Sequence, residues 1–252
     1  MVIIAINCKL ILHLFTMIRL ITDFDGPISD VSERYYQVYL LCLEKNRRWD
    51  QQVQVLDKEK FWQLKRSRTP EKQIGIISGL DETQAEDFAL LRKRTVHTQP
   101  YFEHDQIAPG AVEALLKVQQ TGIDLAVMTM RRVRELEYAL QNFKLYQFFP
   151  ENRRYCLSND YVKTRDIEDK PLLMARALKE LPPAEDTWMV GDTEADIAAA
   201  KKHGVKSIAV ECGIRDRASL ETYHPDIFVA NLTEAVNFVI NRYDSSEIKT
   251  NN

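Results

Sequence analysis

After about residue 109 the chain alternates short apolar runs with longer amphipathic stretches, and this alternation constrains the fold more than any other feature. The runs IDLAVMT, RRYCLS, DTWMVGD and KSIAVE have the length and composition of buried strands, and an amphipathic helical pattern separates each from the next. Another buried strand is expected at IRLITDF, residues 18–24, before a Gly26-Pro27 turn. Strands that alternate with helices form a parallel sheet covered on both faces. The chain is therefore predicted to be an α/β protein with a three-layer Rossmann-like core.

Residues 31–97 interrupt this alternation. They contain long, charged, amphipathic stretches such as VSERYYQVYLLCLEKN and no clear strand, which indicates an inserted α-helical cap domain. The α/β core is predicted to comprise residues 18–30 and 98–240. The polar end, residues 241–252, is expected to be a flexible tail.

The first 17 residues are apolar enough to raise the question of a signal peptide or membrane anchor. Asn7, Lys9 and His13 interrupt the apolar run before it reaches spanning length, and neither a basic start nor a small-residue cleavage site is present. We expect no association with a membrane. The segment is either a short extension or the product of a wrongly assigned start codon, because Met17 opens the natural first strand MIRLITDFDG.

Charge and cysteine usage narrow the class of protein. The 34 basic residues are outnumbered by 37 acidic residues, so no broad positive surface for nucleic acid is expected. The cysteines lack zinc-site or redox-pair spacing, which favours a reducing, cytoplasmic location; they are Cys8, Cys42, Cys156 and Cys212. We expect a monomer or homodimer that acts on a small molecule.

Polar residues at the ends of the expected strands are the candidates for chemistry, because open parallel sheets bind ligands beyond the carboxyl ends of their strands. These residues are Asp23, Asp25, Thr129, Asp192, Asp196 and Lys170, the last expected just before a helix. Each alone has an ordinary explanation as a helix cap, a turn residue or a solvated lysine. Together, however, the converging carboxylates would repel one another and partly protonate. Mg²⁺ removes that repulsion and commonly bridges carboxylates to a phosphate, so phosphoryl transfer is predicted.

Each candidate can be given a role in that chemistry. Asp23 is placed to attack phosphorus and form an aspartyl-phosphate. Asp25 can protonate the departing alkoxide and later deprotonate water. Lys170 and the Thr129 hydroxyl would bind phosphoryl oxygens, together with backbone amides of the turn at Gly26.

The segments DFDGPISD, VMT, DKP and VGDTEAD resemble, in this order, the four motifs of the haloacid dehalogenase superfamily. The resemblance covers nearly all of the chain after Met17, and the ordered set is far more specific than VMT or DKP alone. It implies a nucleophile at Asp23, an acid/base at Asp25, and a helical cap between the first two motifs. It also implies that Asp23, the Asp25 carbonyl and Asp192 bind the metal, with support from Asp196. The chain looks most like phosphoglycolate phosphatases.

Two positions depart from the family pattern. Pro27 stands where Thr or Val is common, and proline removes one backbone donor from the turn. Met130 and Arg131 follow Thr129 where many phosphoglycolate phosphatases carry a small polar residue, which leaves the exact substrate open.

Substrate identity is expected to depend on the cap, because caps of this kind close over the site. Four cap cations could face an anionic substrate, with a solvated helix face as the plainer alternative; they are Lys65, Arg66, Arg68 and Lys72.

The predicted function is Mg²⁺-dependent hydrolysis of a small phosphorylated metabolite, either phosphoglycolate-like or a sugar phosphate. A phosphomutase would need the same four motifs, and a non-catalytic binding module would keep the fold without turnover. A dehalogenase has no use for a second acid at Asp25, and a receiver domain is smaller and lacks the cap.

Overall fold

The computed structural model describes residues 17–249. The expected N-terminal extension, apart from Met17, therefore lies outside the described residues. None of the helices within this range combines the length and the apolar character needed to cross a bilayer.

The core is a six-stranded parallel sheet with strand order β5-β4-β1-β6-β7-β8. The strands are β1 (Ile18–Thr22), β4 (Asp124–Arg132), β5 (Arg154–Leu157), β6 (Asp186–Gly191), β7 (Lys206–Val210) and β8 (Ile227–Val229). The strand order reverses at β1, which pairs with β4 on one side and β6 on the other. The predicted α/β fold with a parallel sheet is confirmed.

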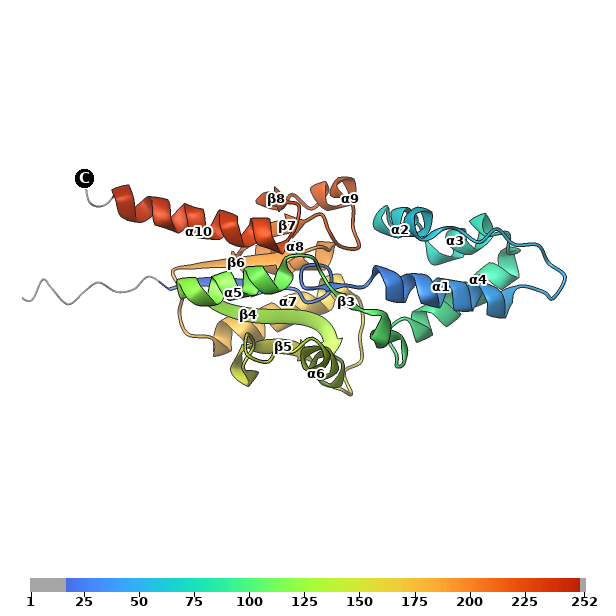
Figure 1. Cartoon of the computed structure of the whole chain (residues 1–252), viewed down its shortest axis with the longest axis horizontal. Helices are drawn as coiled ribbons and strands as arrows, with labels where there is room; N and C mark the ends of the chain where they lie inside the picture. Colours follow the sequence, from blue (N-terminus) through green and yellow to red (C-terminus); the bar gives the residue numbers. More distant parts are fainter. Residues whose placement is uncertain (1–16, 250–252) are drawn as a thin grey trace, which may run out of the picture.

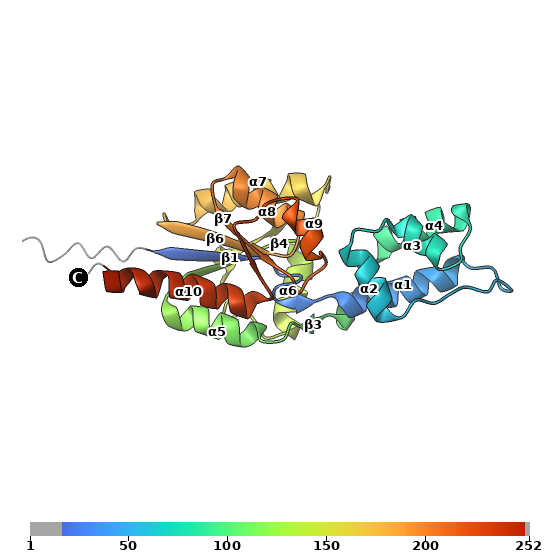
Figure 2. The ribbon, with the colours of Figure 1, turned by 90° about the horizontal axis from the view of Figure 1, so that it is seen from above.

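Helices cover both faces of the sheet, and Figure 2 shows α5 and α10 on the opposite side from α7 and α8. One face packs against α5 (Ala111–Thr121), α6 (Val133–Asn142) and α10 (Leu232–Lys249), and the other against α7 (Asp166–Glu180) and α8 (Glu194–Lys202). Successive residues of β1 pack on opposite faces of the sheet. Leu20 belongs to the apolar cluster on the first face and Ile21 to the cluster on the second, and both are fully buried. This alternation follows from the period of two in a strand.

Four helices lie within residues 31–97 and extend from one end of the core (Figure 1). They are α1 (Ser32–Asn46), α2 (Lys58–Arg66), α3 (Glu71–Ile77) and α4 (Glu82–Thr95). They enclose an apolar cluster of their own, in which Tyr39, Phe61 and Phe88 are fully buried. Where the chain leaves and re-enters the core, β2 (Ser29–Asp30) pairs antiparallel with β3 (Gln106–Ile107). The helical segment is thus joined to the core by two adjacent connections.

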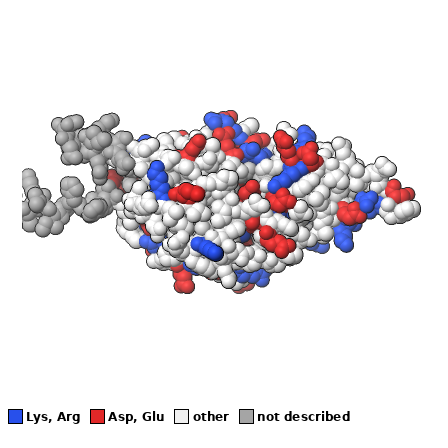
Figure 3. Space-filling model, in the orientation of Figure 1, with Lys and Arg blue, Asp and Glu red and all other residues white. Residues whose placement is uncertain are grey.

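Shorter elements complete the described chain. They are the 3₁₀ turns η2 (Tyr101–His104) and η3 (Glu151–Arg153) and the helix α9 (Arg217–Glu221). Figure 3 shows basic and acidic side chains interspersed on the face drawn.

Three local details differ from expectation. Lys170 lies inside α7, which begins at Asp166 because acidic residues fill its first turn and suit the positive end of the helix dipole. Strand β4 continues past Thr129 to Arg132. Residues 241–249, expected to form a tail, continue α10, whose earlier turns pack on the core.

Candidate active site

Three acidic side chains from separate segments meet beyond the carboxyl ends of β1 and β6. Asp23 follows β1, Asp192 follows β6, and Asp196 lies in the first turn of α8. One carboxylate oxygen from each lies within 4.8 Å of the others, and all three residues are buried. The site is therefore at the point where the strand order of the sheet reverses, where open α/β sheets bind ligands.

Backbone groups and glycines hold Asp192 in place. Its Oδ2 accepts a hydrogen bond from the Ile214 N–H at 2.7 Å. A Cβ atom at Gly26 or Gly213 would overlap the Asp192 carboxylate, and Gly26 also has a positive φ of 87°. The close approach of these loops to Asp192 therefore requires glycine at both positions.

Asp196 has a second, local role in starting α8. Its Oδ2 accepts hydrogen bonds from the Thr193 N–H at 3.0 Å and the Thr193 hydroxyl at 2.7 Å. Asp196 thus belongs to the capping box of the helix while its carboxylate faces the cluster.

Lys170 is the cation at the centre of this cluster. Its Nζ lies 2.6 Å from Asp23 Oδ2 and also pairs with Asp196, and the residue is only 1% exposed. Burial disfavours the charged amine, but Asp196 and Asp23 outweigh burial and raise the Lys170 pKa. Lys170 is therefore held as a cation between two acids.

One lysine does not neutralise three carboxylates. Burial, with a further contribution from Asp196, raises the Asp192 pKa to about 7. Burial also raises the Asp23 pKa well above its usual range, and Asp196 and Asp192 add to that increase despite Lys170. These shifts report unfavourable negative charge. A cluster of buried oxygen donors with excess negative charge fits Mg²⁺, which prefers carboxylate and carbonyl ligands.

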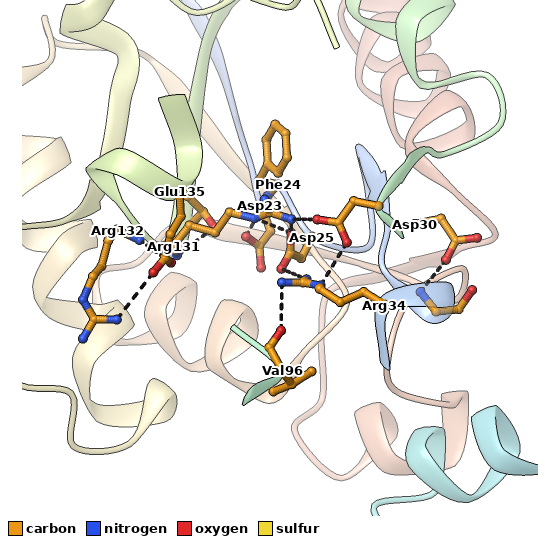
Figure 4. A network of polar contacts seen from close by, with 12 residues as sticks. Asp23, Phe24, Asp25, Asp30, Arg34, Val96, Arg131, Arg132 and Glu135 are labelled. Carbon is orange, nitrogen blue, oxygen red and sulfur yellow. Dashed lines mark hydrogen bonds and ion pairs between the residues drawn. The ribbon is translucent and has the colours of Figure 1, made fainter. Parts of the chain in front are cut away.

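Figure 4 shows Asp25 pointing toward Arg34 and Arg131. Asp25 is not one of the three acids of the cluster. Its Oδ2 accepts from Arg34 Nη2 at 3.0 Å, and its Oδ1 accepts from Arg131 Nε at 2.8 Å. The same arginines bind Asp105, at 2.9 Å from Arg34 and 2.6 Å from Arg131. Two cations and two anions thus form a balanced network. Burial alone would raise the Asp25 pKa, but Arg131 and Arg34 outweigh it and hold the pKa well below its usual range.

Comparison with known proteins finds a matching family model and similar sequences. Residues 169–235, which include Lys170, Asp192 and Asp196, match the model of the HAD-hydrolase-like family. The pyrophosphatase PpaX of Bacillus cereus is 26% identical over 168 residues, which cover 66% of this chain and 74% of that protein. The chain thus resembles haloacid dehalogenase-like hydrolases.

Two further likenesses agree with that family. A phosphoglycolate phosphatase of Pseudomonas fluorescens is 26% identical over 154 residues, 61% of this chain and 54% of that protein. A haloacid dehalogenase-like hydrolase from Streptococcus pneumoniae shares the fold with a TM-score of 0.62 at 17% identity, over 90% of this chain and all of that chain. The two sequence relatives are named a pyrophosphatase and a phosphoglycolate phosphatase, which favours an enzyme over a non-catalytic module.

A cavity of about 130 Å³ brings the remaining candidates of this hydrolase to the carboxylate cluster. Thr129, which is buried, lines it together with Asp23 and Lys170. The Thr129 Oγ1 accepts the Arg131 N–H at 3.2 Å, which leaves the hydroxyl hydrogen for a ligand. The Gly26 amide, expected to bind phosphate, instead donates to the Ser29 carbonyl at 2.9 Å because the turn closes on itself. Gly26 serves the site through the space it leaves for Asp192.

Sequence reasoning missed the partners of Asp25 in this hydrolase. Arg131 was noted only as a departure from the family pattern, although its place near the carboxyl end of β4 was a usable signal. Arg34 in α1 and Asp105 just before β3 carry no comparable signal, because only folding brings them together.

The cap cations of the hydrolase divide between different roles. Arg66 Nη2 donates to the Glu211 carbonyl at 2.5 Å, and the Asp216 N–H donates to the Arg66 carbonyl at 3.1 Å. Arg68 pairs with Glu194 at 3.3 Å. These contacts join the end of α2 and the residues after it to parts of the core beside the site.

The two other cations of that run stay within the cap. Lys72 pairs with Glu82 and Glu86 at an exposed position. Lys65 instead is mostly buried and pairs with Glu71. Among these four cations, only Lys65 lines a cavity next to the site.

Proposed function

We propose that this hydrolase is a Mg²⁺-dependent phosphatase that hydrolyses a small phosphorylated metabolite through an aspartyl-phosphate on Asp23. The observation that carries this proposal is the 2.6 Å contact between Asp23 and the buried cation of Lys170, inside a cavity that also exposes Asp192 and Thr129. Because the Lys170 cation holds the Asp23 carboxylate in one orientation, this carboxylate can attack a phosphoryl group without first reorienting.

The residues that would hold Mg²⁺ are Asp23, Asp192 and the carbonyl of Asp25, with Asp196 in support. The Asp25 side chain is paired with arginines, so its backbone carbonyl is the group left for the metal. Bound Mg²⁺ would supply positive charge that offsets both the buried carboxylates and the phosphoryl oxygens.

Hydrolysis then proceeds in two displacements. In the first, an Asp23 carboxylate oxygen bonds to phosphorus while the bond from phosphorus to the ester oxygen breaks, and Asp25 gives its proton to the leaving oxygen. In the second, water attacks phosphorus, Asp25 takes a proton from that water, and the bond to Asp23 breaks to release phosphate. Lys170 and Thr129 hold the phosphoryl oxygens throughout.

The arginine network favours the second role of Asp25 over the first. Arg34 and Arg131 keep Asp25 ionised, which suits a base that accepts a proton from water. To act as an acid, Asp25 must first take up a proton and loosen one of these contacts. We infer that substrate binding rearranges this network before the leaving group departs.

A phosphomutase remains the second candidate, because it would use the same residues and return the phosphoryl group to its substrate. For the hydrolase, the names of two relatives suggest phosphoglycolate or pyrophosphate as test substrates. We place the enzyme in the cytoplasm as a monomer or homodimer, without nucleic-acid or membrane partners, on the basis of its charge balance and isolated cysteines.

A screen of phosphate esters and pyrophosphate tests this function. Purified enzyme should release inorganic phosphate from at least one compound with Mg²⁺ and from none after EDTA treatment, and Mg²⁺ should restore release. Assays for isomerised sugar phosphates separate the phosphomutase. Failure to release phosphate from any compound in Mg²⁺ would remove the proposal.

A further inference from the structure

A second hollow of about 440 Å³ adjoins the catalytic cavity on the cap side. The two share four lining residues and therefore lie side by side; these are Tyr35, His97, Ile214 and Arg215. Most residues that line this second hollow come from the cap helices α1, α2, α3 and α4. The hollow therefore adjoins the cavity where the phosphoryl group would bind.

Arg92 of α4 lines this hollow and is only 1% exposed. Its Nε lies 3.0 Å from Glu71 Oε2, but Nη1 and Nη2 have no hydrogen-bond partner among the described residues. The guanidinium stacks near Tyr35 and Phe61, with 5.6 and 5.2 Å to the ring centroids. Buried donors without partners are costly, so a ligand that accepts hydrogen bonds from both nitrogens would be favoured here.

The charges around the hollow also favour an anion. Glu71 is the one acidic residue that lines it, and it is shared between Arg92 and Lys65. Lys93 and Arg215 add further positive charge, although Arg215 is paired with Glu194 at 2.8 Å. The lining therefore carries more positive than negative charge. A guanidinium with two free nitrogens matches the paired oxygens of a carboxylate or phosphate.

We propose that Arg92, assisted by Lys65, binds a second anionic group on the substrate, at the end away from the phosphoryl group that Asp23 attacks. This inference rests on the proposed phosphatase function and narrows its substrates to small phosphate compounds with a carboxylate or a second phosphate. Sugar monophosphates with neutral tails fit the site less well. The cap thereby selects substrates through a buried cation, whereas Arg66 and Arg68 bind the core.

Matched substrate pairs test the proposal with the Mg²⁺-loaded enzyme. For a carboxylate, the pair is 2-phosphoglycolate and its uncharged amide; for a phosphate, it is ethane-1,2-diol bisphosphate and the corresponding monophosphate. Wild-type kcat/KM should favour the doubly anionic member of at least one pair by about 10-fold or more, as expected for charge-assisted hydrogen bonds. The pair that shows the preference identifies the anionic group.

Variants then separate binding from packing. Arg92→Met should lower kcat/KM for the doubly anionic member of the pair by about 10- to 100-fold. For the member that lacks the second anionic group, kcat/KM should change by less than about threefold. Arg92→Lys should keep part of the preference. Arg94→Met, at an exposed position of the same helix, is the matched control and should retain the wild-type preference.

Each alternative outcome is decisive. Turnover of both members without preference, or an equal loss on both in Arg92→Met, would overturn the inference and leave Arg92 a packing residue. If Arg92→Met does not fold, Lys65→Met replaces it, and it must lower kcat/KM selectively for the anionic member. Absence of turnover of every compound by wild type would instead reject the phosphatase function itself.

Discussion

Asp25, just beyond β1, and Arg34, near the start of α1, form a 3.0 Å ion pair that joins the catalytic turn to the cap. Arg34 is fully buried and also donates to the Val96 carbonyl near the end of α4. The proposed acid/base is thus held by the segment that carries the cap. Movement of the cap and the charge environment of Asp25 are therefore linked.

Arg34→Met should destabilise the protein. The variant leaves the carboxylate of Asp105, which is 2% exposed, with Arg131 as its remaining cation, and removing one partner of a buried ion pair typically costs about 3 kcal/mol. Urea unfolding at neutral pH measures the change. Arg47→Met, at an exposed pair with Glu44 at the end of the same helix, should unfold near the wild-type urea concentration. Equal midpoints for both variants would show that the network adds no stability.

Asp23→Asn should abolish turnover and preserve the fold. The amide cannot form the acyl phosphate, whereas the isosteric side chain still fills the site and relieves repulsion from Asp192 and Asp196. The thermal midpoint without metal should equal or exceed that of wild type, and phosphate release should fall to background. Asp50→Asn, at an exposed position, serves as the control. Retained turnover in Asp23→Asn would show that another group is the nucleophile.

Metal-free enzyme should lose stability as the pH rises toward neutrality. The Asp192 pKa is about 7 in the folded protein and near 3.8 when unfolded, so the folded state binds more protons between these values. The resulting stabilisation is full below the unfolded pKa and disappears as the pH passes the folded pKa. Urea midpoints measured from about pH 5 to about pH 8 should therefore fall more for wild type than for Asp192→Asn. Saturating Mg²⁺ should reduce this difference between wild type and Asp192→Asn. Identical pH profiles of the two proteins without metal would contradict the prediction.

Lys170→Met should impair both catalysis and folding. It removes a cation that offsets two buried carboxylates and would bind phosphoryl oxygens, so kcat should fall by at least about 100-fold. The free energy of unfolding should fall by about 3 kcal/mol, as for other buried charge pairs that lose one partner. Steady-state kinetics and urea titration measure the two effects. Lys179→Met, exposed in the same helix, should change neither, and wild-type kinetics in Lys170→Met would exclude a catalytic role.

Arg66→Ala should loosen the cap without touching the catalytic carboxylates. Arg66 donates to the Glu211 and Arg215 carbonyls across the junction of α2 and the core. Loss of these hydrogen bonds should raise KM by about 10-fold, because part of the substrate's binding energy would then be needed to close the cap. Hydrogen exchange of residues 211–217 should become faster. Lys72→Ala, whose partners lie within the cap, is the control; unchanged exchange in Arg66→Ala would show that these contacts do not hold the cap closed.

The sequence by itself determined five of the six strands of the main sheet and the helices between them, because burial of apolar residues with period two or 3.6 is a local property of each segment; the short strands β2, β3 and β8 were not predicted. It also placed Asp23 and Asp192 at strand ends, since parallel strands end at one edge of a sheet, whereas β4 continues past Thr129. The helical content of residues 31–97 followed from the same periodicity. Lys170 was expected just before this helix, whereas the acidic residues that precede it already form the first turn of α7.

Only the tertiary structure decided how charges pair across those elements. Arg34 and Asp105 meet because β2 and β3 bring the two cap connections together, and Arg92 faces its hollow because four helices pack around one cluster. The Gly26 amide donates its hydrogen bond within the turn, and the absence of a side chain at Gly26 leaves space for Asp192. Ion pairs of about 3 Å depend on distances between distant segments, and these distances exist only after the whole chain has packed.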